Sequence, residues 1–184
     1  MPEKKTYVAL LRGINVGGNK RVAMADLRAW LQEMGFEQVR TYVQSGNAVF
    51  RSKQPRATLA SAMEKKIEKQ AGFPVRVIVR SAEELKRVLR INPFLKRTGV
   101  DLSKLHVTFL TEEVGAVARD KLLGLPRADD GFEIIDSEMF LHCPNGYGTS
   151  KLGNNVLEKA AGVAATTRNW RTVNALCAMC EEQG

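Results

Sequence analysis

The order of strand and helix patterns is the feature that most constrains the fold, because the same order occurs twice along the chain. Short apolar or alternating runs are typical of strands, and apolar residues three or four positions apart are typical of helices. In the first half this spacing predicts strands at residues 7–11, 38–43, 48–51 and 75–79, with helices near 24–34, 59–67 and 82–91. In the second half it predicts strands at residues 105–110, 132–135, 139–143 and 163–166, with helices at 114–125, 152–161 and 170–182.

Each half is therefore expected to contain a β-α-β-β-α-β unit followed by one further helix. That order is typical of the ferredoxin-like unit, in which helices cover one face of an antiparallel sheet. We predict an α+β fold of two tandem ferredoxin-like halves. Residues 1–92 form the basic N-terminal half in this prediction, and residues 93–184 form the C-terminal half.

Charge is shared unevenly between these halves. Residues 1–92 contain 18 Lys and Arg against 8 Asp and Glu, whereas residues 93–184 contain 10 against 12, and the whole chain has a net charge of +8. A basic half is typical of proteins with a polyanionic partner. It is equally expected if the two halves attract each other or if lysines keep the helices soluble.

Composition narrows the class of protein. No apolar stretch is long enough to cross a bilayer, the N-terminus lacks the basic-then-apolar pattern of a signal peptide, and three cysteines are too few for a disulfide framework. We therefore expect a cytoplasmic protein without a membrane partner.

A glycine-rich loop at residues 12–20 is the strongest candidate for a binding site. It follows a predicted strand and precedes a predicted helix, a position where backbone amides and the charge of a helix start hold anions. Arg12 and Lys20 add positive charge at its ends. The loop lacks both the phosphate-loop lysine and the first G-x-G of dinucleotide sites. The alternative interpretation is that Gly17 and Gly18 serve only to turn the chain.

Polar, glycine-bearing turns recur at the ends of other predicted strands and at other helix starts. If the two halves face each other, these turns line one cleft that suits a small anionic molecule or a nucleotide phosphate. The interpretation in which they only cap helices and form turns stays open beside it. The residues predicted to line such a cleft are Arg12, Asn15, Gly17, Gly18, Asn19, Lys20, Gln44, Ser45, Asn47, Tyr147, Lys151, Asn155, Arg168 and Asn169.

Five stretches, most of them such turns, carry a resemblance to a known family. They are LLRGINVGG (residues 10–18), TYVQSGN (41–47), NPF (92–94), YGTSKL (147–152) and TTRNW (166–170). On these motifs, which are spread over the whole chain, the sequence resembles a widespread bacterial family labelled domain of unknown function 1697. The resemblance implies a two-part α+β fold of ferredoxin-like units and no established activity.

No set of side chains predicts a particular reaction. Tyr147 and Lys151 have the Tyr-x-x-x-Lys spacing of short-chain dehydrogenases, but no nucleotide-binding glycine pattern accompanies them. Cys177 and Cys180 lie on one apolar helix stripe, which favours buried thiols over a zinc site or a redox pair. We therefore expect no metal site and no cofactor, and the sequence leaves open whether the protein is an enzyme.

Two other functions stand as alternatives. The basic half has the topology of RNA-recognition sheets, whose open face carries aromatic and basic side chains. Strand periodicity places Tyr7 on such a face with the four residues predicted to contact nucleic acid, Arg40, Tyr42, Arg76 and Arg80. The second alternative is a protein-interaction module, which predicts a contiguous apolar surface patch.

Overall fold

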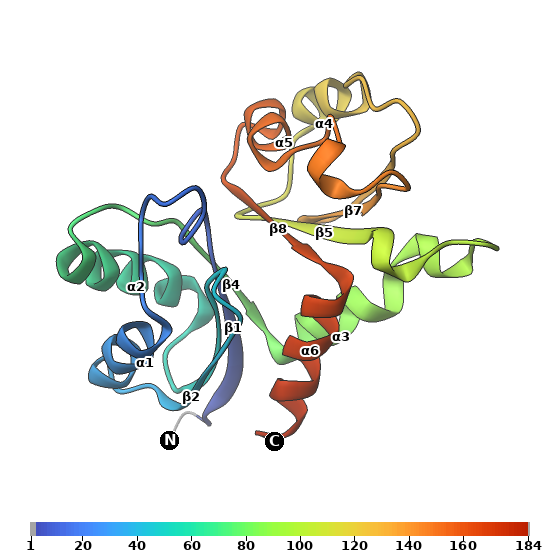
Figure 1. Cartoon of the computed structure of the whole chain (residues 1–184). Coiled ribbons are helices and arrows are strands. Elements are labelled where there is room, and N and C mark those ends of the chain that lie inside the picture. Colours follow the sequence, from blue (N-terminus) through green and yellow to red (C-terminus); the bar gives the residue numbers. More distant parts are fainter. Residues whose placement is uncertain (1–2, 184) are drawn as a thin grey trace. The chain divides into compact units, whose positions relative to one another are not determined.

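The computed structural model describes residues 3–183, which form two compact units (Figure 1). Unit 1 comprises the chain up to Arg87 together with the C-terminal segment from Ala175, and unit 2 comprises Val88–Asn174. The sequence placed the division after residue 92. In the structure the first unit ends slightly earlier, at Arg87, and the C-terminal segment from Ala175 belongs to unit 1.

Polar contacts within unit 1 hold this C-terminal segment. The Arg40 guanidinium pairs with the Glu182 carboxylate at 2.6 Å, and the side-chain amide of Gln183 donates to the Gln38 carbonyl at 2.7 Å. Both contacts join residues that lie far apart in the sequence. Their pairing follows from tertiary structure and has no local sequence signal.

Unit 1 contains a four-stranded sheet with helices packed on it. Its elements are β1 (Lys5–Leu11), α1 (Met24–Glu33), β2 (Glu37–Tyr42), β3 (Asn47–Ser52), α2 (Arg56–Ala71), β4 (Val77–Ser81) and the start of α3 (Ala82–Ile91). The strands lie in the order β2-β3-β1-β4, and every neighbouring pair is antiparallel. The loop after β1 therefore leaves a strand that is held by a neighbour on each side.

Unit 2 contains a second sheet, formed by β5 (Leu105–Leu110), β6 (Gly131–Ile135), β7 (Glu138–His142) and β8 (Ala165–Asn169). Its strands lie in the order β6-β7-β5-β8, which repeats the pattern of the first sheet, and every neighbouring pair is antiparallel. The α+β prediction is confirmed, since the described residues form two such sheets and six α-helices. After α3, the elements are η1 (Pro93–Lys96), η2 (Leu102–Lys104), β5 (Leu105–Leu110), α4 (Ala116–Leu123), β6 (Gly131–Ile135), β7 (Glu138–His142), η3 (Tyr147–Thr149), α5 (Asn154–Ala161), β8 (Ala165–Asn169) and α6 (Trp170–Glu181).

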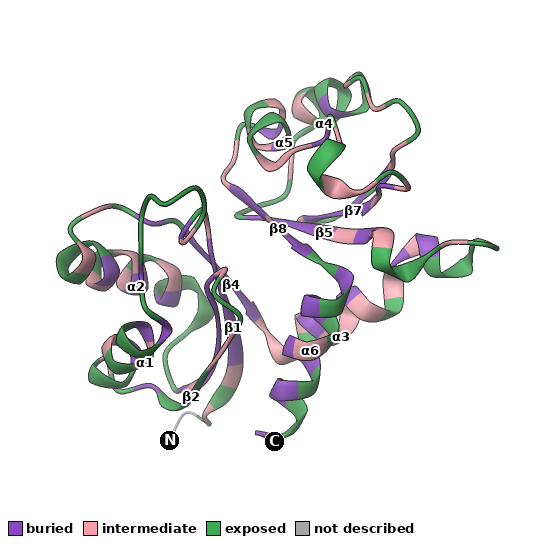
Figure 2. Ribbon diagram, in the orientation of Figure 1, coloured by how far each residue is buried: buried purple, intermediate pink, exposed green. Residues whose placement is uncertain are grey.

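Alternation along β1 explains how unit 1 packs. Tyr7 and Leu11 point into the core beneath α1 and α2, whereas Val8 and Leu10 point to the opposite face, and all four are buried. Figure 2 shows the burial of the strands and helices along the ribbon. The helices supply core residues that their spacing predicted, namely Leu27, Leu31, Leu59, Met63 and Ile67. No helix in the described residues is both long and apolar enough to span a membrane.

The last strand differs most from its prediction. The sequence placed it at residues 163–166, but β8 covers Ala165–Asn169 and pairs with β5 in a register that sets Thr167 opposite Thr108. Its residues lack an apolar alternation. They form a strand because β5 supplies the hydrogen-bonding partner, which periodicity within the segment does not reveal.

Candidate functional site

The loop between β1 and α1 is a tight hairpin. Gly17 and Gly18 have φ of +62° and +79°, and beside them the Asn19 amide donates to the Val16 carbonyl at 3.4 Å. Positive φ at both central residues is the type I′ geometry that glycine adopts without steric cost. Residues 19–23 separate these glycines from the first residue of α1. The two glycines therefore turn the chain ahead of α1, which begins at the predicted residue, and contact of this loop with a ligand stays a prediction.

Asn15 holds this hairpin in place. Its side-chain amide donates to the Val22 carbonyl at 2.8 Å and to the Gln44 carbonyl at 2.7 Å, and its Oδ1 accepts from the Val22 amide at 2.9 Å. These bonds use both donors of the side chain. Asn15 therefore positions the loop, and its amide donors are already engaged where the sequence predicted contact with a ligand.

The turn between β2 and β3 packs against the same loop. Asn47 is fully buried, and its side-chain amide donates to Ser45 Oγ at 3.0 Å. Gly46 has a φ of +84°, and a Cβ at this position would lie 2.6 Å from Ile14 Cδ1. Asn47 therefore shapes the turn, and Gly46 allows the turn to approach the loop closely.

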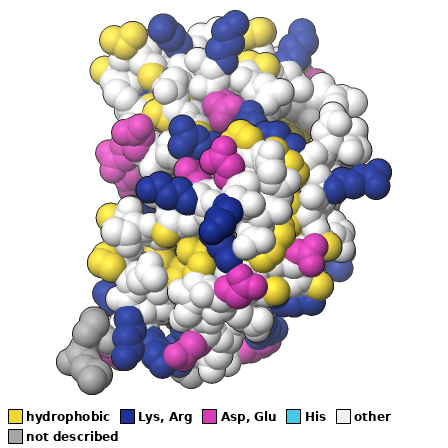
Figure 3. Space-filling model, turned by 90° about the vertical axis from the view of Figure 1, so that its left-hand side faces the viewer, with side chains coloured by type: hydrophobic (Ala, Val, Ile, Leu, Met, Phe, Trp, Pro, Cys, Tyr) yellow, Lys and Arg dark blue, Asp and Glu magenta, His cyan; other side chains and the backbone are white. Residues whose placement is uncertain are grey.

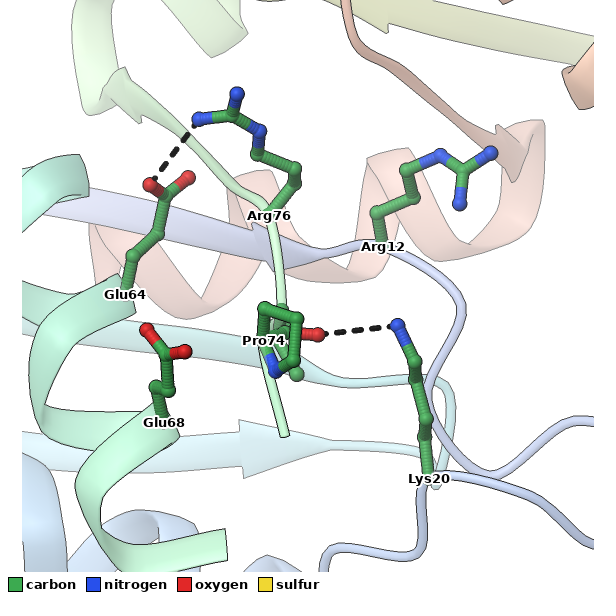
Figure 4. Close-up of a pocket in the computed structure, with 7 residues that line it drawn as sticks. Arg12, Lys20, Glu64, Glu68, Pro74 and Arg76 are labelled. Atoms are coloured by element: carbon green, nitrogen blue, oxygen red, sulfur yellow. Dashed lines mark hydrogen bonds and ion pairs between the residues drawn. The ribbon is translucent and has the colours of Figure 1, made fainter. Parts of the chain in front are cut away.

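Three cationic side chains border one pocket of unit 1 (Figure 4). Arg12 follows β1, Lys20 follows the hairpin, and Arg76 precedes β4. Two carboxylates of α2, Glu64 and Glu68, complete the ionisable groups around this space of about 380 Å³. We call it the Arg12–Lys20–Arg76 pocket.

Hydrogen bonds between distant segments fix the groups of this pocket. The Arg12 amide donates to the Arg76 carbonyl at 2.9 Å, and the Lys20 ammonium donates to the Pro74 carbonyl at 3.0 Å. Arg76 Nη1 lies 3.4 Å from Glu64 Oε2, and 67% of the Arg76 side chain is exposed. An ion pair this exposed contributes at most about 1 kcal/mol. Arg76 can therefore turn towards a ligand at little cost.

A second hollow of about 470 Å³ lies beside the start of α1. Asn15, Gly18 and Gln44 line it, together with Arg21, which is the single cation among its lining residues. With one charge and with the Asn15 amide already bonded, this hollow offers fewer groups to an anion than the Arg12–Lys20–Arg76 pocket does.

Lys151 lies in a more acidic setting than the sequence predicted. It borders a hollow of about 410 Å³ in unit 2 together with Asp129, Asp130 and Asn145. Asp130 accepts a hydrogen bond from Ser150 Oγ at 2.6 Å. The two carboxylates outweigh the single lysine, so this hollow does not favour an anion.

Arg168 is buried in unit 2. Its Nη1 donates to Thr166 Oγ1 at 2.7 Å, and burial lowers the pKa of Arg168 to about 10. Thr167 contacts Asn154 of α5 at 3.1 Å, and successive strand residues face opposite sides. Arg168 therefore lies on the sheet face away from α5, which contradicts its predicted exposure to a ligand.

The last two predicted residues of unit 2 lie at helix starts. Asn169 Oδ1 accepts from the Thr172 amide at 2.8 Å and so caps α6. Asn155 is exposed in the first turn of α5. Asn169 therefore has the capping role that the sequence analysis left open beside ligand binding.

A polar cluster stands on the helix-covered side of the second sheet. The rings of His106 and Tyr147 stack with centroids 4.7 Å apart, and the hydroxyls of Thr108 and Thr167 lie 2.8 Å from each other. Within the described residues, His106 Nδ1 and the Tyr147 hydroxyl are buried and make no hydrogen bond of good geometry. Burial raises the pKa of Tyr147 and lowers the pKa of His106.

The residues predicted to contact nucleic acid do not form an open basic face. Arg80 is only 3% exposed, and Arg40 pairs with Glu182. Tyr7 lies on the opposite face, in the core, so its predicted placement beside these arginines is wrong. Tyr42 is partly buried. On the one face of the molecule that Figure 3 shows, Lys and Arg side chains are interspersed with Asp and Glu.

All three cysteines are free and buried, as the apolar helix stripe predicted for two of them. Burial raises the pKa of Cys143 to about 11 and that of Cys180 to about 12. Thiols with such pKa values are protonated near neutrality and unreactive. Within residues 3–183, no three His, Cys, Asp or Glu side chains lie together as a set that could hold a metal ion.

A family model described as "Protein of unknown function (DUF1697)" matches residues 4–140. The chain belongs to the DUF1697 family. The matched range contains every residue of the Arg12–Lys20–Arg76 pocket, whereas Tyr147 and Lys151 lie beyond it.

A solved structure supports the architecture of both units. The chain is similar to a structure titled as that of conserved bacterial protein SP0830 from Streptococcus pneumoniae, with a TM-score of 0.79 and 26% sequence identity. The similarity covers 97% of this chain and 99% of the other. Comparison with curated proteins gave no match.

Sequence reasoning missed the acidic members of the pocket in this DUF1697 protein. Glu64 and Glu68 are the two acidic residues of α2, and they lie one helical turn apart. That spacing could have marked a shared face. Their position at the pocket is set by the packing of α2 on the sheet, for which the sequence holds no local signal.

Proposed function

We propose that unit 1 binds a small anionic molecule in the Arg12–Lys20–Arg76 pocket. The observation that carries the proposal is that three cationic residues from three separate segments line one space of about 380 Å³. Backbone hydrogen bonds already join these segments. The backbone of the pocket is therefore ordered before a ligand binds, which favours affinity, and the entropy lost on binding is that of the cationic side chains.

A phosphate or carboxylate group suits these donors. Arginine presents paired N–H groups that match two oxygens of either anion, and lysine adds a compact charge. The pocket volume lies near the lower end of the usual range for small-molecule sites. We therefore propose a small metabolite or the phosphate end of a nucleotide as the ligand, in preference to a polymer.

The test is a thermal-shift titration of the full chain with inorganic phosphate, acetate and adenosine monophosphate. A ligand that prefers the folded state raises the melting temperature. Lys20→Gln and Arg76→Gln should each weaken binding about 10- to 100-fold, since a hydrogen bond to a charged group contributes about 1.5–3 kcal/mol.

Lys69→Gln is the matched control for this titration. It removes one positive charge from an exposed position near the end of α2, and Lys69 does not line the pocket. Affinity in this variant should stay within about twofold of wild type. The proposal fails if none of the three anions raises the melting temperature, or if Lys69→Gln weakens binding as much as Lys20→Gln does.

Nucleic-acid binding through Arg40, Tyr42, Arg76 and Arg80 stays a prediction with less support, because Arg80 is buried and Arg40 is paired. It requires affinity for short RNA that falls steeply with salt. The participation of Lys151 in anion binding also stays a prediction, and Lys151→Gln in the same titration tests it.

We propose in addition that both units are ferredoxin-like. The element order β-α-β-β-α-β in each unit and the matching strand orders of the two sheets support this assignment. A cytoplasmic location remains an expectation from composition alone.

A further inference from the structure

Glu68 adds a negative charge to the border of the Arg12–Lys20–Arg76 pocket. It lies one turn after Glu64 on α2, and both line the pocket. Glu64 is engaged twice, since its carboxylate accepts from the Val77 amide at 2.9 Å and pairs with Arg76 at 3.4 Å. The exposed carboxylate of Glu68 makes no hydrogen bond or ion pair within residues 3–183.

Lys20 is the complementary group on the other side. Figure 4 shows Glu68 and Lys20 approaching Pro74 from opposite directions. The hydrogen bond of the Lys20 ammonium goes to the neutral Pro74 carbonyl, and no described carboxylate pairs with it. Glu64 keeps its hydrogen bond from the Val77 amide when Arg76 turns towards the anionic group. The pocket therefore presents a positive side at Lys20 and Arg12 and a negative side at Glu68.

From this arrangement we infer that the ligand carries an ammonium group in addition to its anionic group. The inference rests on the proposed anion-binding function and specifies its ligand class as a small zwitterion or amino-phosphate. A purely anionic ligand is repelled by Glu68, whereas a ligand with both charges meets an opposite charge at each end. Charge complementarity between ligand and pocket affects which ligand is preferred more than it affects how tightly that ligand binds.

The experiment compares ligands that differ only in the ammonium group. The two pairs are ethyl phosphate with O-phosphoethanolamine, and butyrate with γ-aminobutyrate. Dissociation constants are measured by NMR titration of the 15N-labelled full chain. If a pair binds to the wild-type protein, we expect its amino ligand to bind about 2- to 5-fold more tightly than its ligand without the ammonium group. This ratio is the range of an exposed ion pair. The ratio should shrink as salt is added.

Two charge-neutralising variants separate the contribution of Glu68 from net charge. Glu68→Gln should abolish the preference for the amino ligand and strengthen binding of the purely anionic one. Glu113→Gln changes the net charge equally at an exposed position in unit 2, so the preference should persist there.

The outcomes distinguish this inference from the function on which it rests. Equal affinities within a pair that binds, or a preference that survives Glu68→Gln, would overturn the zwitterion inference while anion binding stands. Failure of all four ligands to bind would overturn both. A preference for the amino ligand that is lost in Glu68→Gln but kept in Glu113→Gln supports both anion binding and the zwitterion inference. Whether the phosphate pair or the carboxylate pair shows this preference identifies the anionic group of the ligand.

Discussion

Gly46→Ala is the substitution for which the structure defines the outcome most closely. The new Cβ would lie 2.6 Å from Ile14 Cδ1, 2.9 Å from Ile14 Cγ1 and 2.9 Å from Leu11 Cβ. Ile14 and Leu11 are both fully buried. Leu11 Cβ is fixed to β1 and cannot move aside. The turn must therefore shift away from the loop, or the strand must distort.

Two contributions determine the expected loss of stability. A non-glycine residue at φ +84° costs about 1–2 kcal/mol, and overpacking a buried contact costs typically about 1–3 kcal/mol more. We therefore expect Gly46→Ala to lower the free energy of unfolding by about 2–5 kcal/mol. Gly35→Ala is the matched control, because Gly35 has φ of +81° and a Cβ there would have no neighbour within 4 Å. It should cost only the first contribution.

Urea unfolding followed by the fluorescence of Trp30 measures this difference within unit 1. Trp30 packs against the core of unit 1, and Trp170→Phe as the common background removes the other tryptophan of the chain. The excess cost of Gly46→Ala over Gly35→Ala is the steric contribution. Equal costs for the two substitutions would refute the reasoning.

A double-mutant cycle with Ile14 tests the mechanism. Ile14→Val removes Cδ1, the atom closest to the new Cβ, and by itself costs about 0.5–1.5 kcal/mol. In the Gly46→Ala background the same change relieves the clash, so it should cost less or restore stability. Additive effects would show that Gly46→Ala acts through another contact.

Three further predictions concern other polar groups of the fold. Asn15→Ala removes three hydrogen bonds of the loop and should destabilise unit 1 by about 1–3 kcal/mol in urea unfolding, whereas Asn19→Ala in the same loop should stay within about 0.5 kcal/mol of wild type. Tyr147→Phe removes a buried hydroxyl without a well-formed hydrogen bond, so thermal unfolding should show unchanged or slightly higher stability; a clear loss would mean that the hydroxyl has a partner in solution. Burial lowers the pKa of His106 in the folded protein below its usual value of 6.5. The folded state therefore keeps its full stability above pH 6.5, where the ring is neutral in both states, and loses stability as pH falls through the folded-state pKa. His106→Gln should flatten this loss in urea unfolding measured between about pH 5 and 7.

The candidate site was only partly predictable from the sequence. Arg12 and Lys20 were found because glycines and cations cluster within one short loop. Arg76 was assigned to a different surface, because strand periodicity does not show that its backbone accepts the Arg12 amide proton. Asn15 was predicted to contact a ligand, and its structural role was missed, since only the folded chain brings Val22 and Gln44 within reach of its side chain.

The sequence by itself determined the identity and order of most strands and helices, because hydrophobic periodicity and turn residues act over a few neighbouring positions. Tertiary structure alone decided which charges meet. Packing of α2 on the first sheet brings Glu64 and Glu68 to the Arg12–Lys20–Arg76 pocket, and pairing of β8 with β5 sets the buried Arg168 opposite Val107. Such contacts join segments far apart in the chain, and their energies depend on distances that no local pattern encodes.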